Sequence, residues 1–321
     1  MEKAVVFGPE RSLVGVWTEP AAPVPGNERV AVIMINSGII HHAGAWRLHV
    51  RVARALAEIG VASLRFDLSG IGDSGYGLQP ESLNESVLRD MDEAIQYVGE
   101  TRGWRRIVMM GLCSGAVDAI QAAHRQDAVV GAIAIDLLGD FRNWRHYAVH
   151  YGHRLLRVES WKSTVLLKNG TIERWFRAAA ARLTPGSTPN EDPPQLDGGR
   201  RPMTRQEVGN TLRVLVGRDV KLLCAFSSGL EDNYNHHGQF AEVFPGLAAD
   251  PRTTVVFFRD ADHTFSDREQ QRGLITLIVD WMETAFGEAR EGSVGGFPPA
   301  SAASGGAGPG SEGEMHTLER G

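Results

Sequence analysis

The sequence predicts an α/β protein with a mostly parallel central sheet, flanking helices and a helical lid insertion. Strand-like and helix-like segments alternate along the chain, which is typical of strands joined by crossover helices. Several strand-like segments, such as "RVAVIMIN", are continuously apolar, as strands covered on both faces are. The chain has 321 residues, of which 42% are hydrophobic, and this suffices for one large α/β domain or two modest ones.

The amino-terminal part of the chain supplies the first strands and helices of this sheet. Apolar and β-branched runs predict strands over 3–7, 12–17, 29–36, 61–67, 105–111 and 129–136. Apolar residues at helical spacing predict helices over 45–60, over 82–100 and from about 114 to 125. The first two strands are short and adjacent, so we expect them to form a hairpin at the edge of the sheet.

The alternation stops after residue 137 and resumes at residue 218. Strands over 220–227 and 253–260, with helices near 237–244 and over 273–286, complete the predicted sheet. We interpret 138–217 as an inserted helical lid in which "NWRHYAVHYGHRLL" and "IERWFRAAAARL" form helices and the proline-rich stretch 184–202 is an exposed loop. The predicted organisation is therefore a core formed by 1–137 and 218–286, the lid 138–217, and a disordered tail over 287–321.

Composition and charge exclude several classes of function. The net charge is -6 and no dense run of Lys and Arg occurs, so neither a nucleic acid nor an anionic membrane surface is an expected partner. The first residues lack a signal-peptide pattern and no apolar run approaches the roughly 18 residues of a membrane span, so we expect a cytoplasmic protein. Cys113 and Cys224 lack metal-ligand spacing, so we expect free thiols and neither a metal nor a cofactor.

The segment "GIGDSG", residues 70–75, fits a dinucleotide-binding pattern but lacks the context of that pattern. Asp90 and Asp92 lie about 20 residues further on, as the pattern requires. The third glycine should open a helix, however, whereas Gly75 is followed by "YGLQP", whose glycine and proline would break a helix. We therefore do not expect nucleotide binding.

The segment "RRIVMMGLCSGAVDAIQAA" predicts a nucleophile elbow centred on Cys113. It reads as a buried strand, a Gly-x-Cys-x-Gly turn and a helix, which is the context that an elbow needs. Gly111 and Gly115 are small where strand and helix approach each other, while the Cys113 side chain projects above the sheet edge. Ser114 fails as the nucleophile because Leu112 stands two positions before it. The alternative is that Cys113 is an inert small residue in a tight turn.

A catalytic cysteine also needs a base and an orienting acid, and the sequence offers both in the expected chain order. His263 lies in "FFRDADHTFSD", between the last predicted strand and the final helix. We therefore predict that His263 is the base. Asp232, in "SGLEDNYNHH" after the strand 220–227, is the predicted acid, with Glu231 in reserve.

The remaining polar candidates lie in the loop after the strand 29–36. We predict that the oxyanion hole uses the backbone N–H groups of Ser114 and of Ile39, which follows Gly38 in that loop. His41 and His42 could contact a substrate, although paired loop histidines commonly have no chemical role. Cys224, inside a predicted buried strand, is expected to be a small core residue.

Three motifs together resemble the α/β-hydrolase superfamily: "ARALAEIGVASLRFDLSGIGDSG", "GLCSGA" and "DADHTF". The resemblance is greatest to the serine-aminopeptidase-like branch that includes exosortase-associated hydrolases, and it covers 28–136 and 218–286. It implies an α/β-hydrolase fold. The chain departs from most relatives outside this branch at Ser37-Gly38, where they carry His-Gly, and from most members at Cys113, where they use Ser. A cysteine elbow resembles dienelactone hydrolases and polyhydroxyalkanoate synthases.

These observations predict acyl chemistry through a thioester on Cys113. The first hypothesis is hydrolysis of a small-molecule ester or thioester, free or carrier-bound. The second is an acyltransferase or cyclase that uses the same intermediate, and the third is a catalytically silent binding protein on the same fold. Within the insertion, Trp175 and Phe176 belong to an apolar cluster that we predict to line the acyl pocket.

Overall fold

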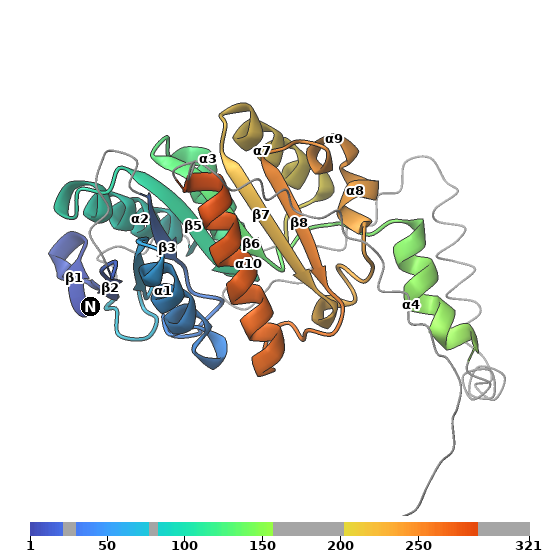
Figure 1. The fold of residues 1–321 in the computed structure, drawn as a ribbon, viewed down its shortest axis with the longest axis horizontal. Helices are drawn as coiled ribbons and strands as arrows, with labels where there is room; N and C mark the ends of the chain where they lie inside the picture. Colours follow the sequence, from blue (N-terminus) through green and yellow to red (C-terminus); the bar gives the residue numbers. More distant parts are fainter. Residues whose placement is uncertain (22–29, 77–82, 157–201, 288–321) are drawn as a thin grey trace, which may run out of the picture. The chain divides into compact units, whose positions relative to one another are not determined.

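A mixed sheet of eight strands lies at the centre of the protein (Figure 1). The structure is a computed structural model that describes residues 1–21, 30–76, 83–156 and 202–287. The strand order is β1-β2-β4-β3-β5-β6-β7-β8, with β1, β2 and β4 antiparallel to one another in turn and all later pairs parallel. The strands are β1 (Glu2–Phe7), β2 (Leu13–Thr18), β3 (Val30–Met34), β4 (Ala62–Phe66), β5 (Arg106–Leu112), β6 (Val129–Ile135), β7 (Lys221–Ser227) and β8 (Thr253–Phe258).

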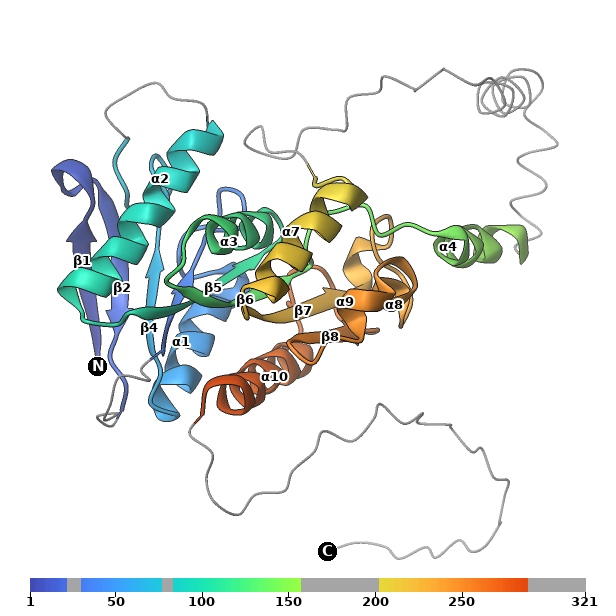
Figure 2. The same cartoon turned by 90° about the horizontal axis from the view of Figure 1, so that it is seen from above.

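Helices cover both faces of this sheet (Figure 2). Helices α2, α3 and α7 lie on one face, and α1 and α10 lie together on the other. The longer helices are α1 (Leu48–Glu58), α2 (Leu83–Gln96), α3 (Ser114–Arg125), α4 (Trp144–Leu156), α7 (Arg205–Gly217) and α10 (Arg268–Phe286). Shorter helical segments are η1 (Pro9–Arg11), η2 (Ala45–Arg47), η3 (Tyr97–Thr101), η4 (Ser228–Leu230), α8 (Gln239–Val243) and α9 (Pro245–Ala248).

The strands with continuously apolar sequences are buried on both faces of the sheet. In β3, Ala31 and Ile33 join the core under α2, α3 and α7, whereas Val32 and Met34 join the core under α1 and α10. Every residue of β3 is buried. The predicted fold class, a mostly parallel sheet with flanking helices, is confirmed.

The segment between β6 and β7 begins and ends with a helix that the structure describes. At its end, α7 packs against α3, and Val208, Leu212 and Leu215 are fully buried. Residues 205–217, which we placed in the insertion, therefore belong to the layer that covers the sheet. Residues 157–201 and the tail 288–321 lie outside the described residues, so the predicted lid and disordered tail stay predictions. Within the described parts, no helix combines the length and apolar character of a membrane span.

Candidate active site

Polar side chains follow three strands of the parallel part of the sheet at one edge. Cys113 follows β5, Asp136 follows β6, and His263 lies in the loop between β8 and α10. Because β5, β6, β7 and β8 are parallel, their carboxyl ends share this edge, and the three side chains meet there. The sequence placed two of these residues at the site, Cys113 and His263, and missed the third.

The turn that carries Cys113 has a strained backbone conformation. Cys113 adopts φ 60° and ψ −119°, a region that non-glycine residues rarely occupy. Its backbone N–H donates to the Ile135 carbonyl at 2.9 Å, which ties the turn to the end of β6. A Cβ at Gly111 would lie 2.0 Å from the Gly115 carbonyl oxygen, and a Cβ at Gly115 would lie 2.5 Å from the Asn36 oxygen. Both glycines are therefore required for the close approach of β5, α3 and β3.

His263 takes its orientation from Asp136. The distance between His263 Nδ1 and Asp136 Oδ2 is 2.9 Å. Asp136 is 1% exposed, and its two carboxylate oxygens also accept hydrogen bonds from the backbone N–H and the hydroxyl of Ser227, each at 2.6 Å. A buried carboxylate held by three hydrogen-bond donors in this way has one fixed direction. Because Nδ1 of His263 contacts Asp136, Nε2 is the ring nitrogen that can exchange a proton with Cys113.

The loop that carries His263 is pressed against the turn after β7. A Cβ at Gly229 would lie 2.0 Å from the His263 backbone nitrogen, so this position must be a glycine. The Ser228 hydroxyl donates to the Ala261 carbonyl at 3.1 Å, and the Trp46 indole N–H donates to Thr264 Oγ1 at 3.1 Å. These contacts fix the backbone on both sides of the imidazole.

The surroundings of His263 favour its protonated form. Burial lowers its pKa, but hydrogen bonds to Asp136 and Cys113 and the charges of both groups outweigh burial and raise the pKa from 6.5 to about 10. A protonated His263 is held between a carboxylate and a sulfur atom. The arrangement can therefore stabilise an imidazolium and exchange a proton with the Cys113 side chain.

Asp232, the acid expected from the sequence, does not lie beside His263. Its side chain is 95% exposed, and a carboxylate oxygen lies 3.9 Å from His150 Nε2 on α4. Asp232 lies beyond the turn η4, and Glu231 is exposed as well. This corrects the expected acid: the carboxylate that contacts His263 belongs to Asp136. Its signal in the sequence was an aspartate directly after the buried run "VVGAIAI".

The predicted oxyanion donors lie on two segments that contact each other. The Gly38 backbone N–H donates to Ser114 Oγ at 2.8 Å, which joins the loop after β3 to the first turn of α3. Within the described residues, neither the Ser114 nor the Ile39 backbone N–H donates to a protein acceptor. Both groups can therefore bind an anionic oxygen, and their role as the oxyanion hole stays a prediction.

Other residues singled out in the sequence lie away from the Cys113–His263–Asp136 contacts or outside the described structure. Cys224 is fully buried in β7, and burial raises its pKa to about 12. His41 and His42 contact Asp67 at the loop after β4. Trp175 and Phe176 lie outside the described residues, so their place in an acyl pocket stays a prediction.

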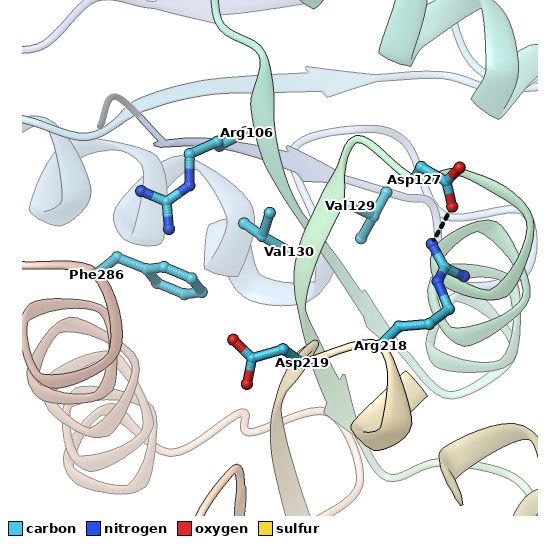
Figure 3. A pocket seen from close by; sticks show the side chains of 7 residues that line it. All are labelled: Arg106, Asp127, Val129, Val130, Arg218, Asp219 and Phe286. Carbon is cyan, nitrogen blue, oxygen red and sulfur yellow. Dashed lines mark hydrogen bonds and ion pairs between the residues drawn. The ribbon is translucent and has the colours of Figure 1, made fainter. Parts of the chain in front are cut away.

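A pocket shown in Figure 3 lies at the opposite edge of the sheet. Arg106, Val129 and Asp219 line it at the amino ends of β5, β6 and β7, and Phe286 closes one side. Arg218 also lines the pocket and forms an ion pair with the Asp127 carboxylate at 2.9 Å. The pocket is thus separated by the length of the strands from the edge that carries Cys113.

Comparisons with known proteins agree with this architecture. Residues 27–166 match the model of a family described as serine aminopeptidase, S33. No curated protein matches the chain in sequence. Identities below 25% in the structural matches indicate a shared fold. The chain is similar to Est1E from Butyrivibrio proteoclasticus, with 16% identity and a TM-score of 0.51 over 89% of this chain and 99% of that chain. It is similar to an esterase from Pyrococcus furiosus, with 14% identity and a TM-score of 0.51 over 89% of this chain and 94% of that chain. It is also similar to the α/β hydrolase GrgF from a Penicillium species, with 14% identity and a TM-score of 0.50 over 89% of this chain and 99% of that chain.

Proposed function

We propose that the chain, which has the fold of α/β hydrolases and matches a serine aminopeptidase family model over residues 27–166, hydrolyses a carboxylic ester or thioester through an acyl-enzyme on Cys113. The observation that carries this proposal is the continuous contact from Cys113 to His263 and from His263 to Asp136. Nucleophile, acid and base also follow one another in that order along the chain, as in the superfamily motif. The expected acid, Asp232, is replaced by Asp136 in this proposal.

The first half-reaction forms a thioester. With the shared proton on His263, the Cys113 sulfur attacks the substrate carbonyl carbon, so that a C–S bond forms and the carbonyl oxygen becomes an oxyanion. The backbone N–H groups of Ser114 and Ile39 stabilise that oxyanion. When the tetrahedral intermediate collapses, the bond to the leaving group breaks and His263 returns its proton to the departing oxygen or sulfur.

The second half-reaction consumes the thioester. His263 removes a proton from water, the hydroxide adds to the thioester carbonyl, and the C–S bond breaks to release the carboxylic acid and the free Cys113 sulfur, with the proton again on His263. In both half-reactions, Asp136 holds the imidazole in one tautomer and stabilises the imidazolium. This role requires a buried carboxylate with a fixed direction, which the contacts of Ser227 provide.

The cysteine itself favours acyl transfer or cyclisation as the second candidate function. Where a serine would leave an ester, Cys113 leaves a thioester, which is a better acyl donor to an amine, alcohol or thiol. The two functions share the first half-reaction and differ only in the acceptor. Adding hydroxylamine to the assay separates them, because an enzyme built for transfer diverts a larger share of the acyl group from water to the amine.

Intact-protein mass spectrometry tests the acyl-enzyme directly. The protein is incubated with a panel of p-nitrophenyl esters and acyl thioesters of short and long chain length. We expect a mass increase equal to one acyl group, which peptide mapping assigns to Cys113. The Cys113→Ala variant should show neither adduct nor turnover, whereas Cys224→Ala should show both. Unchanged turnover in Cys113→Ala would refute the mechanism, and a folded protein that forms no adduct and turns over no member of the panel would favour a silent binding protein.

A further inference from the structure

Two loops beside the candidate active site bring together two histidines and two aspartates. His41 and His42 lie in the loop after β3, and Asp67 and Asp73 lie in the loop after β4. Each residue offers one donor atom, and these four atoms all lie within 4.8 Å of one another. None of the four side chains takes part in the Cys113–His263–Asp136 contacts described above.

We propose that His41, His42, Asp67 and Asp73 bind a divalent transition-metal ion of the Zn²⁺ type. In a tetrahedral Zn²⁺ site, ligand bonds of roughly 2.0–2.1 Å place neighbouring donor atoms about 3.3 Å apart. The distance from His41 Nε2 is 3.2 Å to Asp73 Oδ2 and 3.5 Å to Asp67 Oδ2. The distance between His42 Nδ1 and Asp67 Oδ2 is 2.7 Å, so an ion would have to widen this one pair.

The buried carboxylate of the cluster is held in place before any ion binds. Asp67 is fully buried, and its Oδ1 accepts hydrogen bonds from the His42 backbone N–H at 2.6 Å and from Asn36 Nδ2 at 2.9 Å. A Cβ at Gly72 would lie 2.3 Å from Asp67 Oδ2, so the loop "GIGDSG" wraps closely around this carboxylate. Outer hydrogen bonds that orient a ligand in this way are typical of metal sites.

The outer half of the cluster is open to solvent. The side chains of His41 and Asp73 are 44% and 63% exposed, which gives an ion a path to the buried pair. Two imidazoles with two carboxylates suit Zn²⁺, Co²⁺, Ni²⁺ or Cu²⁺, whereas Mg²⁺ and Ca²⁺ prefer oxygen donors alone. Two ionised carboxylates also balance the charge of a divalent cation. The donor set therefore selects a transition metal.

The cluster lies where a bound ion would connect two loops. His41 lies two residues after Ile39, in the loop that contacts Ser114 through Gly38. An ion held by all four ligands would connect this loop to the loop after β4. We therefore expect binding to raise the unfolding temperature of the protein.

Cobalt titration tests the site, because four-coordinate Co²⁺ absorbs visible light far more strongly than six-coordinate Co²⁺. The full chain is treated with a chelator and studied as the Cys113→Ala variant, so that the thiol beside His263 cannot act as a ligand. We expect one equivalent of Co²⁺ to bind with strong visible absorption and Zn²⁺ to displace it. Calorimetry with Zn²⁺ gives the affinity, and thermal unfolding gives the stabilisation.

Three variants in the same background assign the binding to these ligands. His41→Gln and Asp73→Asn alter exposed side chains and should each weaken Zn²⁺ binding at least about tenfold. His124→Gln, at an exposed histidine on α3, should bind Zn²⁺ as the parent does. Circular dichroism checks that all variants fold. Absence of stoichiometric binding in the parent, or binding that neither His41→Gln nor Asp73→Asn weakens, would overturn the proposal.

Discussion

Two aspartates follow neighbouring strands at the same edge of the sheet, and their surroundings are opposite. Asp136, after β6, is 1% exposed and accepts hydrogen bonds from Ser227 and His263. Asp232, beyond β7, has a side chain that is 95% exposed and lies 3.9 Å from His150. Only a buried carboxylate with fixed partners can hold an imidazole in one orientation, because an exposed carboxylate is solvated and free to rotate.

The backbone distinguishes the two aspartates as well. Asp136 has φ 48° and Cys113 has φ 60°, whereas Asp232 is not among the non-glycine residues with positive φ. Such conformations cost about 1–3 kcal/mol each and persist where the surrounding structure fixes them. At this edge, such strain occurs in the turns after β5 and β6 and at Phe265 (φ 52°) in the loop that carries His263. The turn after β7 contributes to the site in another way: because Gly229 has no Cβ, the backbone of His263 can lie close against this turn.

The largest expected effect comes from removing the negative charge of the buried aspartate. We expect Asp136→Asn to lower kcat/KM by roughly 10³–10⁴-fold, because the amide can no longer hold His263 in the required tautomer. The matched change Asp232→Asn should alter kcat/KM by less than about twofold, as is usual for an exposed side chain. Steady-state kinetics on an activated ester gives both values. A larger loss in Asp232→Asn than in Asp136→Asn would reverse our assignment of the acid.

Much of the site could be predicted because local sequence determines it. Gly111 and Gly115 mark the elbow through steric necessity, which any chain with this strand, turn and helix must meet. His263 could be placed because it lies between the last strand and the last helix. Both predictions use only the order of elements along the chain.

The acid could not be chosen in this way. Asp136 reads as the last residue of an apolar strand, and its contact with His263 joins positions 127 residues apart in the sequence. Asp232 has a more typical loop sequence around it, and burial is what separates the two. The pairing of Asp67 with His42 was missed for the same reason, since these residues lie in the loops after two different strands.

The two cysteines also have different surroundings. Cys113 is partly exposed and hydrogen-bonded to His263, whereas Cys224 is fully buried with its pKa raised to about 12 by burial. We expect iodoacetamide to alkylate Cys113 at least about 100-fold faster than Cys224, because Cys113 is partly exposed, whereas Cys224 is buried and its burial raises the pKa of its thiol. Peptide mapping of a time course measures both rates. Equal alkylation rates for the two cysteines would contradict the contact between Cys113 and His263. The His263→Ala variant should show slower alkylation of Cys113.

The raised pKa of His263 predicts how stability depends on pH. The pKa is 6.5 in the unfolded chain and about 10 in the folded protein, so protonation favours the folded state. The resulting stabilisation is fully present below pH 6.5 and is lost as the pH rises through about 10. Urea unfolding should therefore show the largest difference between wild type and His263→Gln near pH 6, with a smaller one near pH 10. A difference that is constant or grows with pH would contradict this contact network.

The smallest effect concerns the turn after β7, whose contribution we assign to its shape. In Gly229→Ala, the new Cβ would lie 2.0 Å from the His263 backbone nitrogen and 2.6 Å from the Asp262 carbonyl carbon, so backbone must move. We expect a loss of about 1–3 kcal/mol in the free energy of unfolding and a fall in kcat/KM, because the His263 loop shifts away from Asp136. Gly246→Ala is the control: no atom lies within 4 Å of its added Cβ, and we expect a change within about 0.5 kcal/mol. If Gly229→Ala leaves both quantities unchanged, the turn is not pressed against His263, and Asp232 again becomes a candidate for the acid.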